Sequence, residues 1–228
     1  VQYPQASLIA GGTDLMLEVT QRYQHFERLI DVSRVMELRS ITETQDTYCI
    51  GASVTYTELE RFFAQRSLSL VSLLHRLGSR QIRNCGTIGG NLANGSPIAD
   101  MPPVLICWGA TVELCTSSGQ TRGVSINEFY RGYRQTVLQA DEYIAGIRIP
   151  KRSLDSFARF YKSSKRIEDD ISSVMGAFLF QGDGSKITAA RIAFGGMAAT
   201  PVSLPGIEDI LVGKTINKRL LSEVGEAI

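Results

Sequence analysis

The chain has 228 residues, 43% of them hydrophobic, a composition typical of folded globular proteins that excludes a disordered chain. Its 24 Lys and Arg residues nearly cancel its 23 Asp and Glu residues, and no basic run is interleaved with aromatic side chains, so nucleic-acid binding is not expected. No apolar run approaches the roughly 20 residues of a membrane-spanning helix, and no leader peptide precedes the first predicted strand, so we expect a cytoplasmic protein without a membrane partner.

The four cysteines have irregular spacing and form no C-x-x-C pair. This pattern fits neither a zinc site nor an iron–sulfur cluster, so we expect reduced thiols and no metal in this chain. The first residue is Val1, and a strand signal begins shortly after it. We therefore expect a piece of a longer polypeptide.

The first fifty residues are predicted to form a small α+β unit. A short apolar run, a glycine pair and apolar residues at helical spacing predict a strand, a turn and a helix. The elements expected in this part are strands at 7–10 and 28–32, a helix at 15–23 between them, and a hairpin of strands at 40–44 and 48–52.

The middle of the chain is predicted to be a second α+β unit around a glycine-rich segment. Its expected elements are helices at 57–65, 68–77 and 102–108, a hairpin at 110–116 and 123–126, and a strand at 142–150. Ser125 and Glu128 have the spacing of a capping box, so a short helix should start there. The segment Gly86–Gly95 has no regular periodicity and is predicted to be a functional loop.

The last third is predicted to be a further α+β unit that stops before it is complete. Strands are expected at 157–163, 172–180 and 186–194, with a helix from about Ile207. A charged stretch at 165–170 separates the first two of these strands.

The first candidate ligand site is the glycine pair in Ala10-Gly11-Gly12-Thr13-Asp14. Glycine permits a close backbone approach, and free N–H groups at the start of a helix attract anions, so a pyrophosphate fits there. The motif is neither G-x-G-x-x-G nor a P-loop with its lysine. Taken alone, it is more often plain turn geometry than a phosphate site.

The second candidate is the segment from Arg83 to Asp100, in which four glycines alternate with small polar residues. Such residues permit a nest of backbone N–H donors. Further donors for phosphate oxygens are the side chains of Thr87, Asn91, Asn94 and Ser96. Asp100 can accept hydrogen bonds from two ribose hydroxyls. Two glycine-rich segments indicate a diphosphate gripped from both sides.

The third candidate is the charged run Tyr161–Ser172, in which basic residues precede acidic ones. A solvated surface loop stabilised by its own ion pairs explains this run equally well. His25 and His75 lack metal-ligand spacing, and Trp108 is most simply a core residue. No G-x-S-x-G motif supports a hydrolase.

Three segments in this order resemble one family: LIAGGTDL at 8–15, RQIRNCGTIGGNLANGSPIADMPP at 80–103 and YKSSKRIEDDISSV at 161–174. They are similar to the FAD-binding domain of the molybdenum hydroxylases, and most similar to the small iron–sulfur and FAD subunit of the bacterial xanthine dehydrogenases. The segment IAFGGMAATPV at 192–202 resembles the start of that family's C-terminal flavoprotein subdomain.

The resemblance implies an α+β fold. It consists of a two-part FAD-binding domain of the vanillyl-alcohol-oxidase (PCMH) type, followed by the start of an α+β subdomain of the CO dehydrogenase flavoprotein type. The expected parts are an N-terminal part at 1–53, a second part with the glycine-rich loop at 54–150, and a truncated C-terminal subdomain at 155–228.

The resemblance also implies roles for individual residues. The FAD diphosphate and ribityl chain would be held from one side by Leu8, Ile9, Ala10, Gly11, Gly12, Thr13, Asp14 and Leu15, and from the other by Thr87, Gly89, Gly90, Asn91 and Asn94. Asp100 would bind the adenosine ribose, Ile144 would lie against adenine, and Leu77 would pack on the flavin ring. Lys162 would lie at the pyrimidine edge of the flavin, and Asp169 beside the face that accepts nicotinamide.

The implied function is electron transfer in purine metabolism. Single electrons would enter FAD from [2Fe–2S] clusters, and a hydride would pass from flavin N5 to NAD. The clusters and the molybdopterin are expected on an N-terminal [2Fe–2S] domain and a separate large subunit. Alternatives are the medium FAD subunit of a CO dehydrogenase or hydroxybenzoyl-CoA reductase, and a nucleotide-binding module without redox activity.

Overall fold

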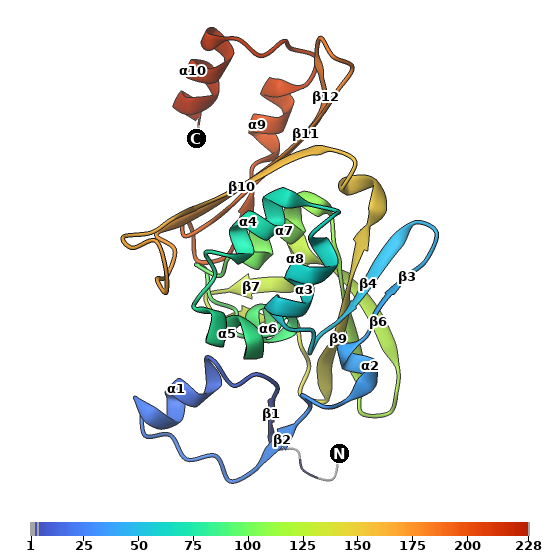
Figure 1. Cartoon of the computed structure of the whole chain (residues 1–228), viewed down its shortest axis with the longest axis vertical. Coiled ribbons are helices and arrows are strands. Elements are labelled where there is room, and N and C mark those ends of the chain that lie inside the picture. The colour runs from blue at the N-terminus through green and yellow to red at the C-terminus, as the bar shows by residue number, and fades with distance from the viewer. Residues whose placement is uncertain (1–2, 4, 228) are drawn as a thin grey trace.

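The structure is a computed structural model that describes residue 3 and residues 5–227. Figure 1 shows an elongated molecule with the blue N-terminal segment at one end, the red C-terminal helices at the other, and a helical middle beside a sheet. Within the described residues, no helix combines the length and the apolar character that crossing a lipid bilayer requires.

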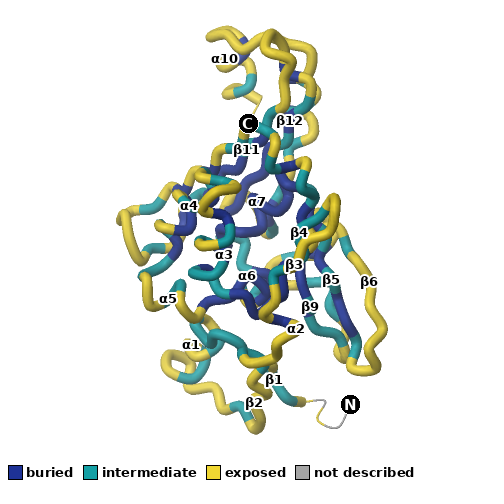
Figure 2. Tube along the Cα trace, turned by 45° about the vertical axis from the view of Figure 1, so that its right-hand side comes forward, coloured by how far each residue is buried: buried dark blue, intermediate teal, exposed yellow. Residues whose placement is uncertain are grey.

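The N-terminal unit consists of two short strands and a helix. The strand β1 (Ser7–Ile9) pairs in parallel with β2 (Leu29–Asp31), and α1 (Leu15–Thr20) lies between them in sequence. No residue of α1 is buried, and Figure 2 shows the unit as mostly exposed or half-buried. The turn between β1 and α1, which carries the glycine pair, brings this unit into contact with the middle of the chain.

Five antiparallel strands form the main sheet. In spatial order they are β3 (Ile41–Glu43), β4 (Thr47–Gly51), β9 (Glu142–Pro150), β5 (Thr111–Thr116) and β6 (Thr121–Ser125). The central strand β9 pairs with β4 on one side and with β5 on the other. The N-terminal hairpin, which follows α2 (Met36–Arg39), therefore shares one sheet with the middle of the chain.

Helices cover this sheet and form the main core. They are α3 (Tyr56–Phe63), α4 (Leu68–Leu74), α5 (Arg80–Cys85), α6 (Ile88–Ala93), α7 (Met101–Trp108) and α8 (Ile126–Phe129). All residues of α7 are buried, so this apolar helix lies at the centre of the core. Trp108 at its end stacks on Phe63 with ring centroids 5.5 Å apart and meets the edge of Phe160 at 5.7 Å.

A second antiparallel sheet follows the one-turn helix η1 (Lys151–Ser153). Its strands are β10 (Phe157–Ser163), β11 (Val174–Gly182), β12 (Ile187–Gly195) and β13 (Val202–Ser203), and the helices α9 (Pro205–Leu211) and α10 (Lys218–Ala227) complete the chain. One face of this sheet packs on α7, where the Cys107 thiol donates to the Ala177 carbonyl over 3.3 Å. The other face shares a small apolar cluster with α9 and α10.

The predicted α+β class is confirmed, and most expected elements are present within a few residues of their predicted bounds. The prediction of a loop at Gly86–Gly95 is wrong, because α6 occupies most of it. A helix does follow Ser125, although the Ser125 side chain makes no cap hydrogen bond. A further hairpin, β7 (Tyr130–Gly132) and β8 (Gln135–Thr136), was not expected from the sequence.

Candidate functional site

A cleft with a volume of about 710 Å³ lies between the N-terminal unit and the middle of the chain. Pockets that bind cofactor-sized ligands usually have volumes of roughly 300–1,000 Å³. The β1–α1 turn, the residues around α6 and the charged segment after β10 all line it. All three candidate segments of the sequence therefore contribute to one cleft.

Most of the predicted site residues line this cleft. They are Leu8, Ile9, Ala10, Gly11, Gly12, Thr13, Asp14, Leu15, Leu77, Thr87, Gly90, Asn91, Asn94, Asp100, Lys162 and Asp169. Gly89 and Ile144 are not among the lining residues. The Gly89 N–H donates to the Ala52 carbonyl over 2.8 Å, and Ile144 is buried in the main core on β9, opposite Leu114.

The two glycine segments touch each other through their backbones. A Cβ added to Gly11 would lie 1.8 Å from the Cys85 carbonyl oxygen, a distance that no side chain can occupy. Gly12 has a φ of +68°, a left-handed conformation that glycine adopts at no steric cost. The β1–α1 turn therefore lies directly against the end of α5, at the start of the second glycine segment.

Thr87 and tertiary packing hold α6 in place despite its two glycines. The Thr87 hydroxyl accepts a hydrogen bond from the Gly90 N–H over 3.1 Å and so caps the first turn. A Cβ on Gly89 would lie 2.6 Å from Ala52, so the helix can approach the sheet this closely only with glycine there. Gly89 therefore serves helix packing, while Gly90 and Asn91 line the cleft.

Asn91 and Tyr56 place polar atoms in the wall of the cleft. The Asn91 Oδ1 atom is buried and has no hydrogen-bond partner among the described residues, which leaves an acceptor free for a ligand. Tyr56 is 4% exposed, and its burial, followed by the nearby Asp100 carboxylate, raises the pKa of its hydroxyl. Tyr56 therefore stays neutral and can donate a hydrogen bond.

Asp100 and Lys162 form a buried ion pair. The Lys162 Nζ atom lies 2.7 Å from Asp100 Oδ2, and their side chains are 3% and 7% exposed. The Ser172 hydroxyl donates to Asp100 Oδ1, so both carboxylate oxygens have a partner. According to the family resemblance, Asp100 would bind the ribose and Lys162 would lie at the flavin ring, which are separate parts of FAD. In the structure, the two side chains are in direct contact.

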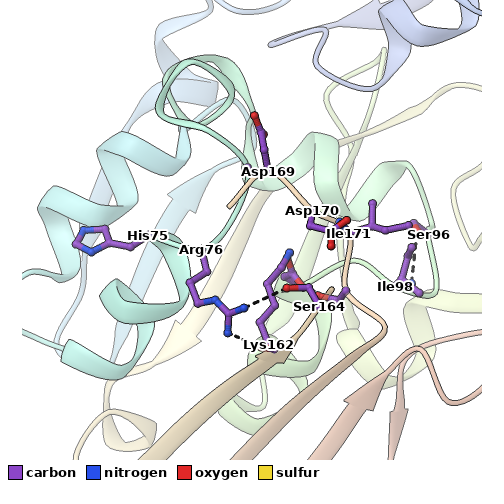
Figure 3. Close-up of polar contacts among 12 residues, drawn as sticks. His75, Arg76, Ser96, Ile98, Lys162, Ser164, Asp169, Asp170 and Ile171 are labelled. Atoms are coloured by element: carbon purple, nitrogen blue, oxygen red, sulfur yellow. Dashed lines mark hydrogen bonds and ion pairs between the residues drawn. The ribbon is translucent and has the colours of Figure 1, made fainter. Parts of the chain in front are cut away.

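Hydrogen bonds connect the charged run Tyr161–Ser172 to the turn between α4 and α5 (Figure 3). Arg76 donates to the Ser164 hydroxyl over 3.1 Å and also to the Lys162 carbonyl. The Asp169 carboxylate accepts from the Ser79 N–H over 2.8 Å, with Asp169 itself in the left-handed region at a φ of +53°. This segment therefore has a defined position at the cleft.

Three charged or polar residues that line the cleft, Glu18, Tyr56 and Arg134, were not predicted from the sequence. Ser172 also lines it, at the end of the third candidate run, and Arg134 lies in the unexpected β7–β8 hairpin. The Arg134 guanidinium donates to Asn94 Oδ1 over 2.6 Å. No local pattern in the sequence marks a contact between residues this far apart.

Comparison with known families divides the chain into two matches. Residues 1–152 match the family described as FAD binding domain in molybdopterin dehydrogenase. Residues 159–228 match the family described as CO dehydrogenase flavoprotein C-terminal domain.

Similar proteins include both separate subunits and complete enzymes. The xanthine dehydrogenase FAD-binding subunit of Escherichia coli O157:H7 is 30% identical over 229 residues, which cover 99% of this chain and 78% of that protein. The xanthine dehydrogenase of Drosophila subobscura is 31% identical over 243 residues, which cover 99% of this chain. The chain spans only 18% of the length of that enzyme.

Solved structures agree with the fold. The carbon monoxide dehydrogenase from Hydrogenophaga pseudoflava that lacks the Mo-pyranopterin moiety matches with a TM-score of 0.91 at 30% identity, over 98% of this chain and 78% of that one. Quinoline 2-oxidoreductase from Pseudomonas putida 86 matches with a TM-score of 0.89 at 30% identity, over the same shares. These matches confirm the predicted FAD-binding fold with its CO dehydrogenase-type continuation. The chain therefore belongs to the family of FAD-binding domains of molybdopterin dehydrogenases, a family of oxidoreductases.

Proposed function

We propose that this chain binds FAD in the cleft and carries electrons within a xanthine dehydrogenase-type molybdenum hydroxylase. The observation that carries the proposal is the contact between the two glycine segments in the wall of a single cleft. A dinucleotide has one diphosphate, and the backbone N–H groups of the first segment can donate to its oxygens together with the polar side chains of the second. The similarity to a xanthine dehydrogenase FAD-binding subunit supports the same assignment.

The residues present fit FAD. A Cβ on Gly90 would lie 2.9 Å from Thr87 Oγ1, and Gly11 has no room for one against Cys85, so no side chain narrows the cleft at either position. The unpaired Asn91 Oδ1 offers an acceptor for a ribityl hydroxyl. Because Asp100 is bound to Lys162, we assign both residues to the flavin end of the cleft, in preference to the ribose for Asp100.

FAD bound here would supply the chemistry of exchanging single electrons with a [2Fe–2S] partner and a hydride with NAD. Lys162 would hold a fixed positive charge beside the ring, which favours its reduced form. Asp169 would lie where nicotinamide approaches. A preceding [2Fe–2S] domain, a large molybdopterin subunit, a role in purine metabolism and a cytoplasmic location are parts of this proposal.

A FAD titration tests the proposal. The purified chain should take up added FAD, show flavin absorbance and bleach with dithionite.

Asn91→Ala should weaken FAD binding about tenfold, because an unpaired buried hydroxyl costs roughly 1–3 kcal/mol. Asn84→Ala is the matched control and should bind FAD like the wild type, since Asn84 Oδ1 accepts a hydrogen bond from the Thr57 hydroxyl outside the cleft. If the wild-type chain takes up no FAD, the alternative hypothesis, that this chain is a nucleotide-binding module without redox activity, replaces this proposal.

A second candidate is the medium subunit of a CO dehydrogenase, favoured by the TM-score of 0.91 to such an enzyme. The two candidates share the FAD site and differ in the electron acceptor. Anaerobic titration with NADH separates them, because a xanthine dehydrogenase-type domain should exchange a hydride with NAD in either direction. If dithionite bleaches the bound FAD and NADH does not, the result favours the hypothesis of a CO dehydrogenase subunit.

A further inference from the structure

The β7–β8 hairpin brings a cation to the place where the two glycine segments meet. The Arg134 guanidinium donates to Asn94 Oδ1 over 2.6 Å, and its Nη2 atom lies 3.7 Å from Asp14 Oδ2. Asp14 belongs to the first glycine segment and Asn94 to the second. Arg134 therefore bridges the two segments, and 33% of its side chain stays exposed at the cleft.

The charges along the cleft make this cation distinctive. Five carboxylates and two cations are found among the described residues that line it. One cation, Lys162, is held by Asp100 in a buried pair, and the carboxylate of Glu18 is paired with Arg22 at 3.0 Å. Arg134 is thus the lining cation that contacts both glycine segments, where a diphosphate would bring two negative charges next to Asp14.

The position of Arg134 is fixed by close backbone packing. Arg134 has a φ of +54° and Gly95 has a φ of +63°, both in the left-handed region. A Cβ on Gly95 would lie 3.0 Å from the Arg134 Cα atom, so the hairpin turn lies tightly on the end of α6. A non-glycine residue held in this region requires support from its surroundings, which this packing provides.

We propose that Arg134 is a diphosphate-binding residue that holds the two glycine segments together around the ligand. This inference rests on the proposed function, because it takes the ligand to be a dinucleotide. A guanidinium has five N–H donors, so Arg134 can keep Asn94 and still donate to a phosphate oxygen. Asp14 then acts as a second acceptor that orients the guanidinium.

The test is a FAD titration of the 228-residue chain at low and high salt. Arg134→Gln removes the charge, Arg134→Lys keeps it, and Arg131→Gln removes an exposed charge of the same hairpin outside the cleft. We expect Arg134→Gln to weaken FAD binding about 10-fold to 100-fold, as the loss of a charged hydrogen bond does. Its affinity should also depend less on salt than that of the wild type. Arg134→Lys should recover part of the affinity, and Arg131→Gln should bind FAD like the wild type.

Each result decides between the two proposals. Equal FAD affinity of the wild type and Arg134→Gln would overturn the role of Arg134 and leave the FAD site intact. Weaker binding with an unchanged salt dependence would reduce Arg134 to a structural residue and overturn the inference. If Arg134→Gln does not fold, Arg134→Asn removes the same charge with a residue that tolerates the left-handed backbone conformation, and its comparison with the wild type at both salt concentrations decides the inference. A wild-type chain that binds no FAD would overturn the proposed function and this inference with it.

Discussion

The Lys162 and Asp100 side chains are almost completely removed from solvent, and each is the main partner of the other's charge. Replacing Lys162 by Met leaves the Asp100 carboxylate buried with only the Ser172 hydroxyl for support. Breaking a buried pair in this way usually costs about 3–5 kcal/mol. We expect Lys162→Met to lower the free energy of unfolding by about that amount, measured by urea denaturation without FAD.

Lys151→Met is the control for this prediction. Lys151 pairs with Glu43 at 2.9 Å, but their side chains are 28% and 53% exposed. A pair in contact with solvent contributes about 0–1 kcal/mol, so this variant should be close to the wild type. Equal losses in the two variants would mean that burial of the Lys162 pair has no effect on stability.

At the residue level, the sequence predicted the site residues that belong to local motifs. It did not predict the residues that tertiary packing places at the cleft. The glycines and Asn91 stand out because small and amide residues are unusual in a long run. Tyr56 and Arg134 reach the cleft through tertiary packing. The pairing of Asp100 with Lys162 joins residues 62 positions apart, and the three-dimensional fold alone brings them together.

Among the elements, the strands β6 and β9 are linked across β5 by Arg122 and Glu142. The Arg122 guanidinium donates to both Glu142 oxygens, at 2.6 and 2.7 Å. These hydrogen bonds lower the pKa of the Glu142 carboxyl from its ordinary 4.5 to about 2. A depressed pKa in the folded state stabilises the protein only while the carboxyl is ionised.

The pH dependence follows from this shift. The stabilisation by Glu142 is fully present above pH 4.5 and is lost as the pH falls toward 2. We expect Glu142→Gln to be less stable than the wild type at pH 7, and the difference in urea midpoint to shrink between pH 5 and pH 3. Glu113→Gln is the control, because its pair with Arg148 is half-exposed. A difference that stays constant with pH would contradict the role of the Glu142 charge.

The elements also show where sequence patterns fail. Two glycines lower helix propensity by about 1 kcal/mol each, so a loop was the reasonable prediction for the segment that forms α6. The cap at Thr87 and the close packing of Gly89 on Ala52 outweigh this cost. Strands and helices with regular apolar spacing were predicted correctly because their burial follows the same period.

At the scale of the whole molecule, the parts predicted at 1–53, 54–150 and 155–228 are closely joined. The first shares the main sheet with the second through β4 and β9, and the third packs on α7 of the second. The division into domains stays a prediction. The sequence indicated the three parts through turns and composition, and the pairing between them could not be predicted because it depends on strands distant in sequence.

This joining predicts a single unfolding transition. Trp108, the only tryptophan, is 1% exposed and lies where α7 meets Phe160 of the second sheet. Its fluorescence therefore reports contact between the second and third parts, whereas circular dichroism reports all helices and strands. We expect both signals to change at the same urea concentration. A fluorescence change well before the loss of circular dichroism would show that the third part separates first.

The middle strand of the main sheet is also the last of its five strands to be synthesised. The hairpins β3–β4 and β5–β6 leave the ribosome with one edge open, and the strand that fills the gap between them ends at Pro150. Translation proceeds at roughly 5–20 residues per second, so on the order of 5–20 seconds pass between the synthesis of the first hairpin and that of β9. Open edges invite pairing with other chains, so the nascent protein passes through an interval in which aggregation competes with closure.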